Sequence, residues 1–341
     1  MDCRVLGSTG VQLTQLSLGT MMFGANGNRD EQDCIRIIHR ALDAGINVVD
    51  TADIYSRSES EQIVGKALTG GRRANVVLAT KANGPMGPDV NQRGNSRRWL
   101  VREVEASLRR LQTDYIDLYQ VHRPDPVTDI GETLAALSDL ISAGKICYAG
   151  HSTFPASEIV AAQWAAERGG RARFVCEQPP YSILARGVEA GVLPVCQRYD
   201  MGALSWGPLA GGWLSGNYRL DAPVPASLRA ARWVQNFDMS LPANHAKLAA
   251  ADKLARLAAA AGMSLIHLSI GFALSHPAVT SVIIGPRTMG HLDSQLDAPG
   301  GLPADLLDAI DAIVPPGVNL NPADAGYVPP AIADPALRRR A

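Results

Sequence analysis

The sequence predicts an α/β fold in which eight parallel strands, each followed by a helix, close into a (β/α)8 barrel. Short apolar runs rich in β-branched residues alternate with segments whose apolar residues recur at helical spacing. Several of these runs end in a polar or ionisable residue, as strands do when they carry side chains to the edge of a sheet. The main alternative is a doubly wound open sheet, which usually has a GxGxxG turn after its first strand. This chain has no such turn, so the closed barrel is favoured.

The predicted strands follow one another along most of the chain. A small hairpin that turns at Gly7-Ser8-Thr9-Gly10 comes before them. The barrel strands are expected at residues 16–20, 46–50, 76–81, 115–121, 146–150, 174–177, 202–206 and 279–284.

The helices between the strands are predicted from apolar residues spaced three and four positions apart. They are expected at about residues 34–42, 60–68, 96–111, 127–143, 156–167, 188–199 and 288–296, with Pro194 disturbing the sixth. After an insertion at 209–240, two extra helices at 246–261 and 265–274 precede the last strand. Residues 1–313, which end in a helix at 304–313, thus form the barrel domain. Residues 314–341 form a proline-rich tail that either covers the pocket or is partly disordered.

The composition argues against several classes of function. There are 32 Lys and Arg against 33 Asp and Glu, so no net field favours nucleic acid or a charged membrane. The five cysteines lack CxxC or metal-finger spacing and are typical of reduced thiols, and the N-terminus lacks the apolar core of a signal peptide. No run approaches the ~20 apolar residues of a membrane span. We expect a soluble, cytoplasmic protein whose basic cluster at residues 338–340 is simply solvated.

Three neighbouring predicted strands bring ionisable residues to one edge of the barrel. Asp50 ends the second strand and Tyr55 follows it, Lys81 ends the third, and His122 follows the fourth. Each has an ordinary interpretation by itself: Asp50 and Lys81 as a structural ion pair, His122 as a rim histidine, Tyr55 as a loop aromatic. Together they indicate an active site, because barrel enzymes place theirs at the C-terminal ends of the strands.

The order and spacing of these residues resemble the aldo-keto reductase superfamily. Asp50 and Tyr55 are followed by Ser60-Glu61, Ala79-Thr80-Lys81 and Gln120-Val121-His122. The resemblance covers roughly residues 2–313. Its other matching stretches are Leu16-Ser17-Leu18-Gly19-Thr20, Ser107-Leu108-Arg109-Arg110-Leu111, Asp114-Tyr115-Ile116-Asp117 and Gly207-Pro208-Leu209-Ala210-Gly211-Gly212.

The resemblance implies an oxidoreductase that reduces aldehydes or ketones to alcohols, reversibly, with NADPH and without metal. Hydride arriving at a carbonyl carbon builds negative charge on oxygen, so the reaction needs a proton donor and a polarising group. Tyr55, with an ordinary pKa of about 10, would be the general acid. Lys81 would lower that pKa, and Asp50 would keep Lys81 charged and aimed. His122 would hydrogen-bond the carbonyl oxygen and orient the substrate.

The resemblance also implies which residues hold the cofactor. Ser152 and Gln178 would bind the nicotinamide carboxamide, although Thr153 stands where many members have Asn. Trp206 occupies the aromatic position that stacks on the nicotinamide, and taken alone it also fits core packing. The remaining contacts on this side would come from Gly19, Thr20, Met21, Asp50, Gly207, Pro208, Leu209 and Gly211, with the glycine turn close to the phosphates.

The adenosine end of the cofactor would lie beyond the last strand, beside Gly285 and Arg287. A guanidinium suits a 2′-phosphate, so NADPH is expected over NADH. The chain departs from the family pattern just beyond, where His291, Ser294 and Gln295 replace a Gln or Arg, a Glu and an Asn. His291 and Gln295 are nevertheless expected to border the adenosine.

Substrate contacts are expected from Met22, Arg123, the loop at 83–95, the insertion and the tail. Arg123 could meet an anionic substrate or form a salt bridge with Asp125. The alternative function is a regulatory or channel-associated subunit that binds the cofactor with little turnover. The complete set of Asp50, Tyr55, Lys81 and His122 favours turnover.

Overall fold

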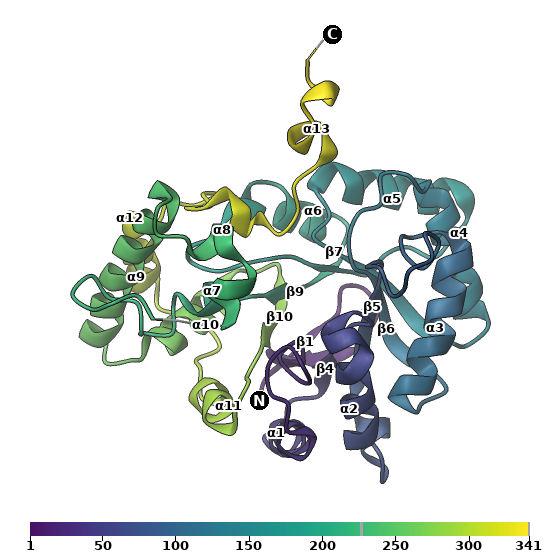
Figure 1. Ribbon diagram of the computed structural model, residues 1–341, viewed down its shortest axis with the longest axis horizontal. Helices are drawn as coiled ribbons and strands as arrows, with labels where there is room; N and C mark the ends of the chain where they lie inside the picture. The colour runs from purple at the N-terminus through teal and green to yellow at the C-terminus, as the bar shows by residue number, and fades with distance from the viewer. Residues whose placement is uncertain (226–227, 340–341) are drawn as a thin grey trace.

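The computed structural model describes residues 1–225 and 228–339, and its centre is a closed barrel of eight parallel strands. Strands that follow one another in the chain are neighbours, and β10 closes the barrel against β3 (Figure 1). This confirms the predicted (β/α)8 fold. The barrel strands are β3 (Leu16–Gly19), β4 (Val48–Asp50), β5 (Val77–Ala82), β6 (Ile116–Val121), β7 (Ile146–Ser152), β8 (Cys176–Gln178), β9 (Gly202–Trp206) and β10 (Val279–Ile284).

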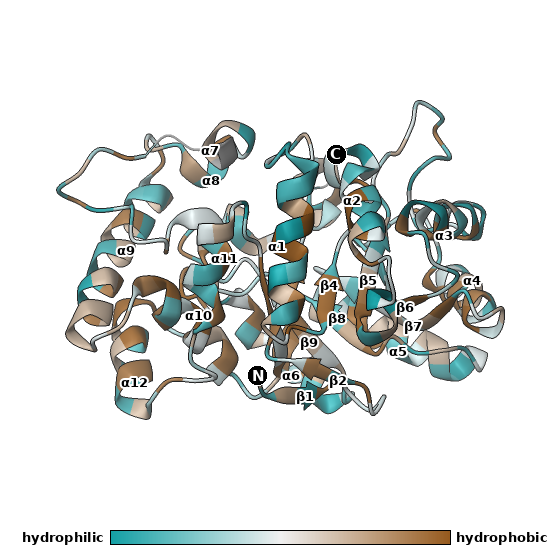
Figure 2. Ribbon diagram, turned by 90° about the horizontal axis from the view of Figure 1, so that it is seen from below, coloured by the Kyte–Doolittle hydropathy of each residue, from teal (hydrophilic) through white to brown (hydrophobic). Residues whose placement is uncertain are grey.

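Helices surround the barrel and bury their apolar faces against its strands (Figure 2). Ser96 caps one of them and Asp129 another, each accepting a backbone N–H through its side chain. The helices between strands are α1 (Glu31–Asp43), α2 (Glu59–Ala67), α3 (Arg97–Leu111), α4 (Ile130–Ser142), α5 (Ala156–Gly169), α6 (Val192–Arg198), α9 (Pro242–Ala260) and α10 (Leu265–Ser275). Beyond β10 lie α11 (Met289–Leu296), α12 (Ala304–Ile313) and α13 (Pro330–Ala333).

The sixth helix and the insertion differ from the sequence prediction. The segment expected as one helix at 188–199 is a 3-10 turn, η3 (Gly187–Ala190), followed by α6. Pro194 lies in the first turn of α6, where its missing N–H costs no helical hydrogen bond. The insertion contains two short helices that were not predicted, α7 (Leu228–Arg232) and α8 (Val234–Phe237).

No single helix in the described part of the chain has the length and apolar composition that a membrane crossing requires, although α9 and α10 together, bent by 94°, pass the same test.

The N-terminal hairpin closes the barrel at the N-terminal ends of its strands. Strands β1 (Cys3–Val5) and β2 (Gln12–Thr14) pair antiparallel, as the sequence predicts. Leu6 and Leu13 of this hairpin are fully buried in a cluster with Val48, Ala79 and Leu118 from the barrel interior. The interior is therefore a packed apolar plug at the N-terminal ends of the strands.

Towards the C-terminal ends of the same strands, the side chains that point into the barrel become polar. Side chains two positions apart share a face of a strand, so Asp50 lies above Val48 and Lys81 above Ala79 inside the barrel. Lys81 is fully buried and Asp50 nearly so. The barrel thus places its interior charges at the C-terminal ends of the strands, above an apolar floor.

The C-terminal segment crosses the barrel rim before it leaves the body of the protein. Leu320 donates its N–H to the carbonyl of Leu184, and Asp324 forms an ion pair with the buried Lys247 at 2.7 Å. A Cβ added at Gly326 would lie 2.9 Å from Cζ2 of Trp206, so the segment passes directly beside that indole. Figure 1 shows α13 projecting away from the barrel. The last residue of the basic cluster at 338–340 lies outside the described residues.

Candidate active site

Asp50, Lys81 and Tyr55 meet at the C-terminal ends of β4 and β5. Lys81 donates from Nζ to Oδ1 of Asp50 at 2.6 Å, to the carbonyl of Thr51 at 2.7 Å and to the hydroxyl of Tyr55 at 3.4 Å. The ammonium also lies 5.1 Å from the centre of the Tyr55 ring. A buried ammonium therefore links a carboxylate to a phenol hydroxyl.

Burial is the largest influence on the pKa values of Tyr55 and Lys81. It raises the pKa of Tyr55, an effect that the Lys81 ammonium opposes without cancelling. The net direction is opposite to the lowering expected from the sequence, because desolvation of a tyrosinate outweighs one neighbouring charge. Burial by itself lowers the pKa of Lys81. Asp50 and Tyr55 together raise it by more than burial lowers it, so the net pKa is raised. The site holds a charged lysine beside a protonated tyrosine.

His122 faces Tyr55 from the end of β6. The two ring centres are 5.8 Å apart and the ring planes meet at 77°. Burial lowers the pKa of His122 well below its usual value, and the charges of Arg123 and Lys81 lower it further. His122 is therefore a neutral imidazole near neutral pH, able to donate one N–H to an oxygen placed beside the Tyr55 hydroxyl.

An unusual turn fixes the position of Tyr55. Ser56, Arg57 and Ser58 all have left-handed backbone conformations, with φ of 49°, 53° and 75°. Such a conformation costs a non-glycine residue roughly 1–2 kcal/mol. Two hydrogen bonds hold the turn: Ser56 donates to the carbonyl of Phe23 at 2.7 Å and Ser58 to that of Asp53 at 3.1 Å. No glycine in this segment marks the turn, and strained backbone of this kind is common at active sites.

Two glutamines complete the ring of polar side chains inside the barrel. Gln178 donates to Oδ2 of Asp50 at 2.8 Å, and Gln120 approaches the same oxygen at 3.4 Å. Gln178 was predicted as a cofactor residue, whereas Gln120 had no predicted role. The period-two alternation on β6 could have identified it, because Gln120 follows the interior Leu118 by two positions.

The ends of β7, β8 and β9 form the other half of the rim. Ser152 donates its hydroxyl to the carbonyl of Gln178 at 2.8 Å, which joins β7 to β8. Trp206 is half-buried at the end of β9 and packs partly on the interior cluster. An alcohol, an amide and an indole at one edge are groups suited to a planar ring that carries a carboxamide.

The turn after β9 is suited to a phosphate. Gly207, Gly211 and Gly212 have positive φ, and a Cβ added at Gly207 or Gly212 would face open space. Arg287 follows the neighbouring strand, β10, where it is half-buried and forms no ion pair with any described residue. Its carbonyl accepts a hydrogen bond from the side chain of Asn28 at 3.0 Å, which fixes the backbone there. Positive-φ glycines and an unpaired guanidinium are groups suited to the phosphates of a dinucleotide.

Several predicted contact residues are occupied elsewhere in the structure. Thr20 is fully buried, and its hydroxyl donates to the carbonyl of Asp50 at 3.0 Å. Met22 is buried beside Gly27, while Met21 stays half-exposed. Gln295 is buried and donates to the carbonyl of His291 within α11. Of the five, Met21 is half-exposed and His291 is exposed on α11.

The remaining predicted contacts also have definite positions. Gly19 allows close packing of β3 on β10, since a Cβ there would lie 2.7 Å from Cγ2 of Ile283. Pro208 is buried, Leu209 is half-buried and Gly285 is exposed beside the last strand.

A buried histidine and glutamate behind this half of the rim were not predicted as a site. His151 bonds through Nδ1 to a carboxylate oxygen of Glu177, and the two belong to adjacent strands. His151 stacks on Phe154 with ring centres 4.5 Å apart. Burial raises the pKa of Glu177, although His151 and two backbone N–H groups oppose the change. The pair fixes the strand ends that carry Ser152 and Gln178.

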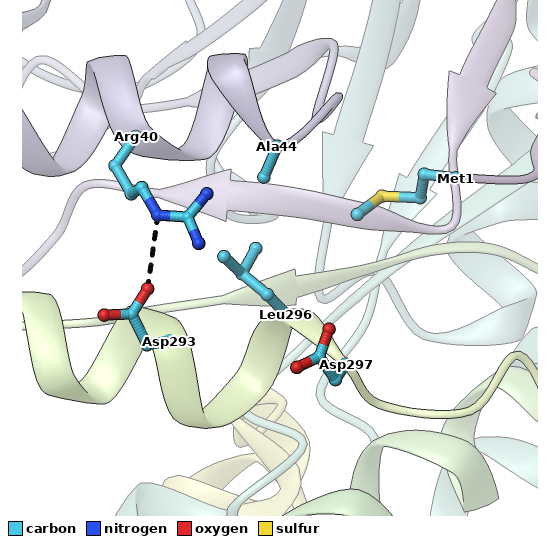
Figure 3. Close-up of a pocket in the computed structure, with 6 residues that line it drawn as sticks. All are labelled: Met1, Arg40, Ala44, Asp293, Leu296 and Asp297. Carbon is cyan, nitrogen blue, oxygen red and sulfur yellow. Dashed lines mark ion pairs between the residues drawn. The ribbon is translucent and has the colours of Figure 1, made fainter.

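A surface hollow of about 450 Å³ lies elsewhere on the protein. Figure 3 shows it between α1 and α11, with the ion pair of Arg40 and Asp293 at one end and Met1 at the other. Helices of this fold run antiparallel to the strands, so the C-terminal ends of α1 and α11 lie at the plugged end of the barrel. The chemistry described above belongs to the opposite rim.

The fold and this rim define the class of protein as a barrel oxidoreductase of the aldo-keto reductase type. The model of the aldo/keto reductase family matches residues 15–315, and the chain belongs to this family. Family members generally bind NAD(P)H, and carbonyl reduction is the chemistry that membership supports.

Three relatives illustrate the range of the family. The uncharacterized oxidoreductase YrpG of Bacillus subtilis (strain 168) is 36% identical over 87% of this chain and 91% of its own length. A probable voltage-gated potassium channel subunit beta of Oryza sativa subsp. japonica is 33% identical over 92% of this chain and 97% of its own. The aldo-keto reductase AMT2 of Alternaria alternata is 35% identical over 73% and 80%.

Proposed function

We propose that this protein reduces the carbonyl group of a small aldehyde or ketone to an alcohol with NADPH. The observation that carries the proposal is the contact of the Tyr55 hydroxyl with Lys81, 3.4 Å away, while Lys81 is itself held by Asp50. When bound, the dihydronicotinamide supplies the hydride.

Tyr55 gives its proton to the carbonyl oxygen of the substrate. The developing tyrosinate is stabilised by the Lys81 ammonium, which Asp50 keeps in place through the bond between Nζ and Oδ1. His122 donates an N–H to the same carbonyl oxygen and so fixes which face of the substrate is presented. Because burial raises the pKa of Tyr55, the phenol stays protonated at neutral pH, which is the form that carbonyl reduction requires.

The preference for NADPH rests on Arg287. Its guanidinium has no carboxylate partner in the described residues and lies beyond β10, where a 2′-phosphate would give it one. Trp206 would cover one face of the nicotinamide, and Ser152 with Gln178 would bind its carboxamide. His291 and Gln295 border this region in place of the more usual residues.

The thiols support a cytoplasmic location. All five cysteines, Cys3, Cys34, Cys147, Cys176 and Cys196, are free. Free thiols are typical of a reducing compartment. Fractionation of the cells that produce the protein tests this directly, since recovery outside the cytoplasm would contradict it.

The experiment that tests the function follows nicotinamide absorbance in purified protein mixed with NADPH and a panel of aldehydes and ketones. Loss of absorbance that depends on both protein and carbonyl compound is expected. The second candidate is a cofactor-binding subunit with little turnover, which the relative named as a potassium channel subunit favours. Tight NADPH binding without turnover of any carbonyl compound would support the second candidate over the first.

A further inference from the structure

Arg123, like Arg287, is a rim residue whose charge has no carboxylate partner among the described residues. It follows His122 at the end of β6, and its backbone is held firmly. The carbonyl of Arg123 accepts from the side chains of Asn95 at 3.0 Å and Asn83 at 3.4 Å. The N–H of His122 bonds to the carbonyl of Ala82 at 2.9 Å. The start of the Arg123 side chain is therefore fixed relative to Tyr55 and His122.

The guanidinium uses one donor inside the protein. Its Nη1 donates to the carbonyl of His122 at 2.5 Å, and across residues 1–225 and 228–339 it forms no ion pair. Asp125, the obvious partner in the sequence, is engaged otherwise. Its carboxylate accepts from Asn95 N–H at 2.9 Å, from Thr128 Oγ1 at 2.7 Å and from Val127 N–H at 3.1 Å. Among the described residues, Arg123 and Asp125 therefore form no salt bridge with each other.

The charged and titratable groups that face Arg123 come from several strands. Burial is the main cause of the pKa shifts of Tyr55, which is raised, and of His122, which is lowered, but the positive charge of Arg123 acts to lower both, so both lie within its field. Among the described residues, Glu177 is the carboxylate whose charge acts on Arg123 in return. Glu177 is committed to His151 on the outer side of the strands, however, and makes no direct contact with the guanidinium. No described carboxylate neutralises Arg123 on the side of the substrate.

A half-buried guanidinium without a counter-ion is costly once water leaves the site. When substrate fills the space beside Tyr55, it displaces the water that would otherwise accept hydrogen bonds from the remaining N–H groups of Arg123. A carboxylate on the substrate would replace it, because the planar fork of arginine matches a carboxylate through two parallel hydrogen bonds. A neutral substrate would leave those donors unpaired.

We propose that Arg123 is a specificity-determining residue that binds a carboxylate group of the substrate, so that the preferred substrates are carbonyl compounds that also carry a carboxylate. This inference rests on the proposed reductase function and narrows its substrate class. Arg123 acts at a distance from the reacting carbonyl and holds the substrate in a single orientation beside Tyr55 and His122.

The test compares matched substrates in the NADPH-loaded enzyme. The probes are 3- and 4-carboxybenzaldehyde and their methyl esters, which differ in charge while the reacting aldehyde is the same. In Arg123→Gln, the ratio of kcat/KM for acid to ester is expected to fall about 10- to 100-fold relative to wild type for at least one isomer, the size expected for charge-assisted hydrogen bonds. The ratio cancels any effect of Arg123 on Tyr55 itself. Arg98→Gln removes the same charge from an exposed position on α3 and should leave the ratio unchanged.

A binding measurement separates failure of this inference from failure of the proposed function. The affinity of benzoate for the NADP+-loaded protein, measured by calorimetry, should weaken about tenfold or more in Arg123→Gln, while Arg98→Gln matches wild type. If wild type reduces neither acid nor ester, the reductase function fails, and benzoate binding still decides the role of Arg123. If wild type reduces the esters but Arg123→Gln changes neither the acid-to-ester ratio nor benzoate affinity, Arg123 does not bind carboxylate, and the reductase function stands.

Discussion

The ammonium nitrogen of Lys81 lies 2.6 Å from a carboxylate oxygen of Asp50, and neither side chain is more than 3% exposed. Removal of one member of such a pair leaves a buried charge uncompensated, which costs about 3–5 kcal/mol. We expect Asp50→Asn and Lys81→Met each to lower the free energy of unfolding by an amount of this order, measured by urea denaturation. The double variant should lose less than the sum of the two. Additive losses would show that the two groups do not stabilise each other.

Tyr55→Phe should lower kcat for carbonyl reduction about 10²- to 10⁴-fold, since it removes the general acid but keeps the ring. NADPH affinity, followed by fluorescence titration, should stay close to that of wild type. Tyr199→Phe, which alters a tyrosine at the end of α6, is the matched control and should reduce substrate normally. Normal turnover by Tyr55→Phe would mean that another group supplies the proton.

Arg287→Ala should weaken NADPH far more than NADH, because only NADPH carries the 2′-phosphate that the guanidinium would bind. Dissociation constants for both cofactors in wild type and variant give the comparison, with NADH as the internal control. An equal loss for the two cofactors would remove Arg287 from a 2′-phosphate site.

His122 should make the fold sensitive to mild acid. Its pKa in the folded state lies well below the value of about 6.5 that it takes in the unfolded chain. Below that pH the unfolded chain binds a proton that the folded protein does not, so stability falls by at most about 1.4 kcal/mol per pH unit. Urea unfolding at several pH values between about 7.5 and 5 should show a shallower loss for His122→Gln than for wild type. The exposed His245→Gln is the control, and equal slopes in all three proteins would contradict the assignment.

Asp324→Asn should loosen the C-terminal segment. Lys247 is fully buried, so loss of its partner leaves a charge that burial already disfavours by lowering its pKa. The variant should be less stable by up to about 3 kcal/mol, because Lys247 can relieve part of the cost by losing its proton. Limited proteolysis should cut the segment faster than in wild type, with Asp334→Asn in the exposed end as control. An unchanged rate would show that the ion pair does not anchor it.

The strand ends that carry the chemistry could be predicted because each local signal agreed with the fold. Asp50 and Lys81 follow apolar runs, and the period of two along a strand decides which side chains enter the barrel. The same reasoning extends to Gln120, which lies in one of the matching stretches but was given no role there. The hairpin was also predictable, since Gly7 and Gly10 bracket its turn and both have positive φ.

Other features depend on contacts between distant parts of the chain. The left-handed turn after Tyr55 is held by Phe23, which lies far away in sequence. Thr20 looks like a ligand-facing residue until its hydroxyl is found on the carbonyl of Asp50. The direction of the Tyr55 pKa shift depends on desolvation, which requires the packed structure. In each case a tertiary contact outweighs what neighbouring residues indicate.

The hydrogen bond from Gln178 to Asp50 joins the two halves of the rim across the barrel. It has a consequence for synthesis of the chain, since the ribosome makes Asp50, Tyr55, Lys81 and His122 well before Gln178. A nascent chain that stops before β8 therefore contains every proton-transfer residue but lacks Gln178, the closer of the two amides that donate to Oδ2 of Asp50. Catalytic activity is thus expected to appear late, when the barrel closes, and not to increase gradually as strands are added.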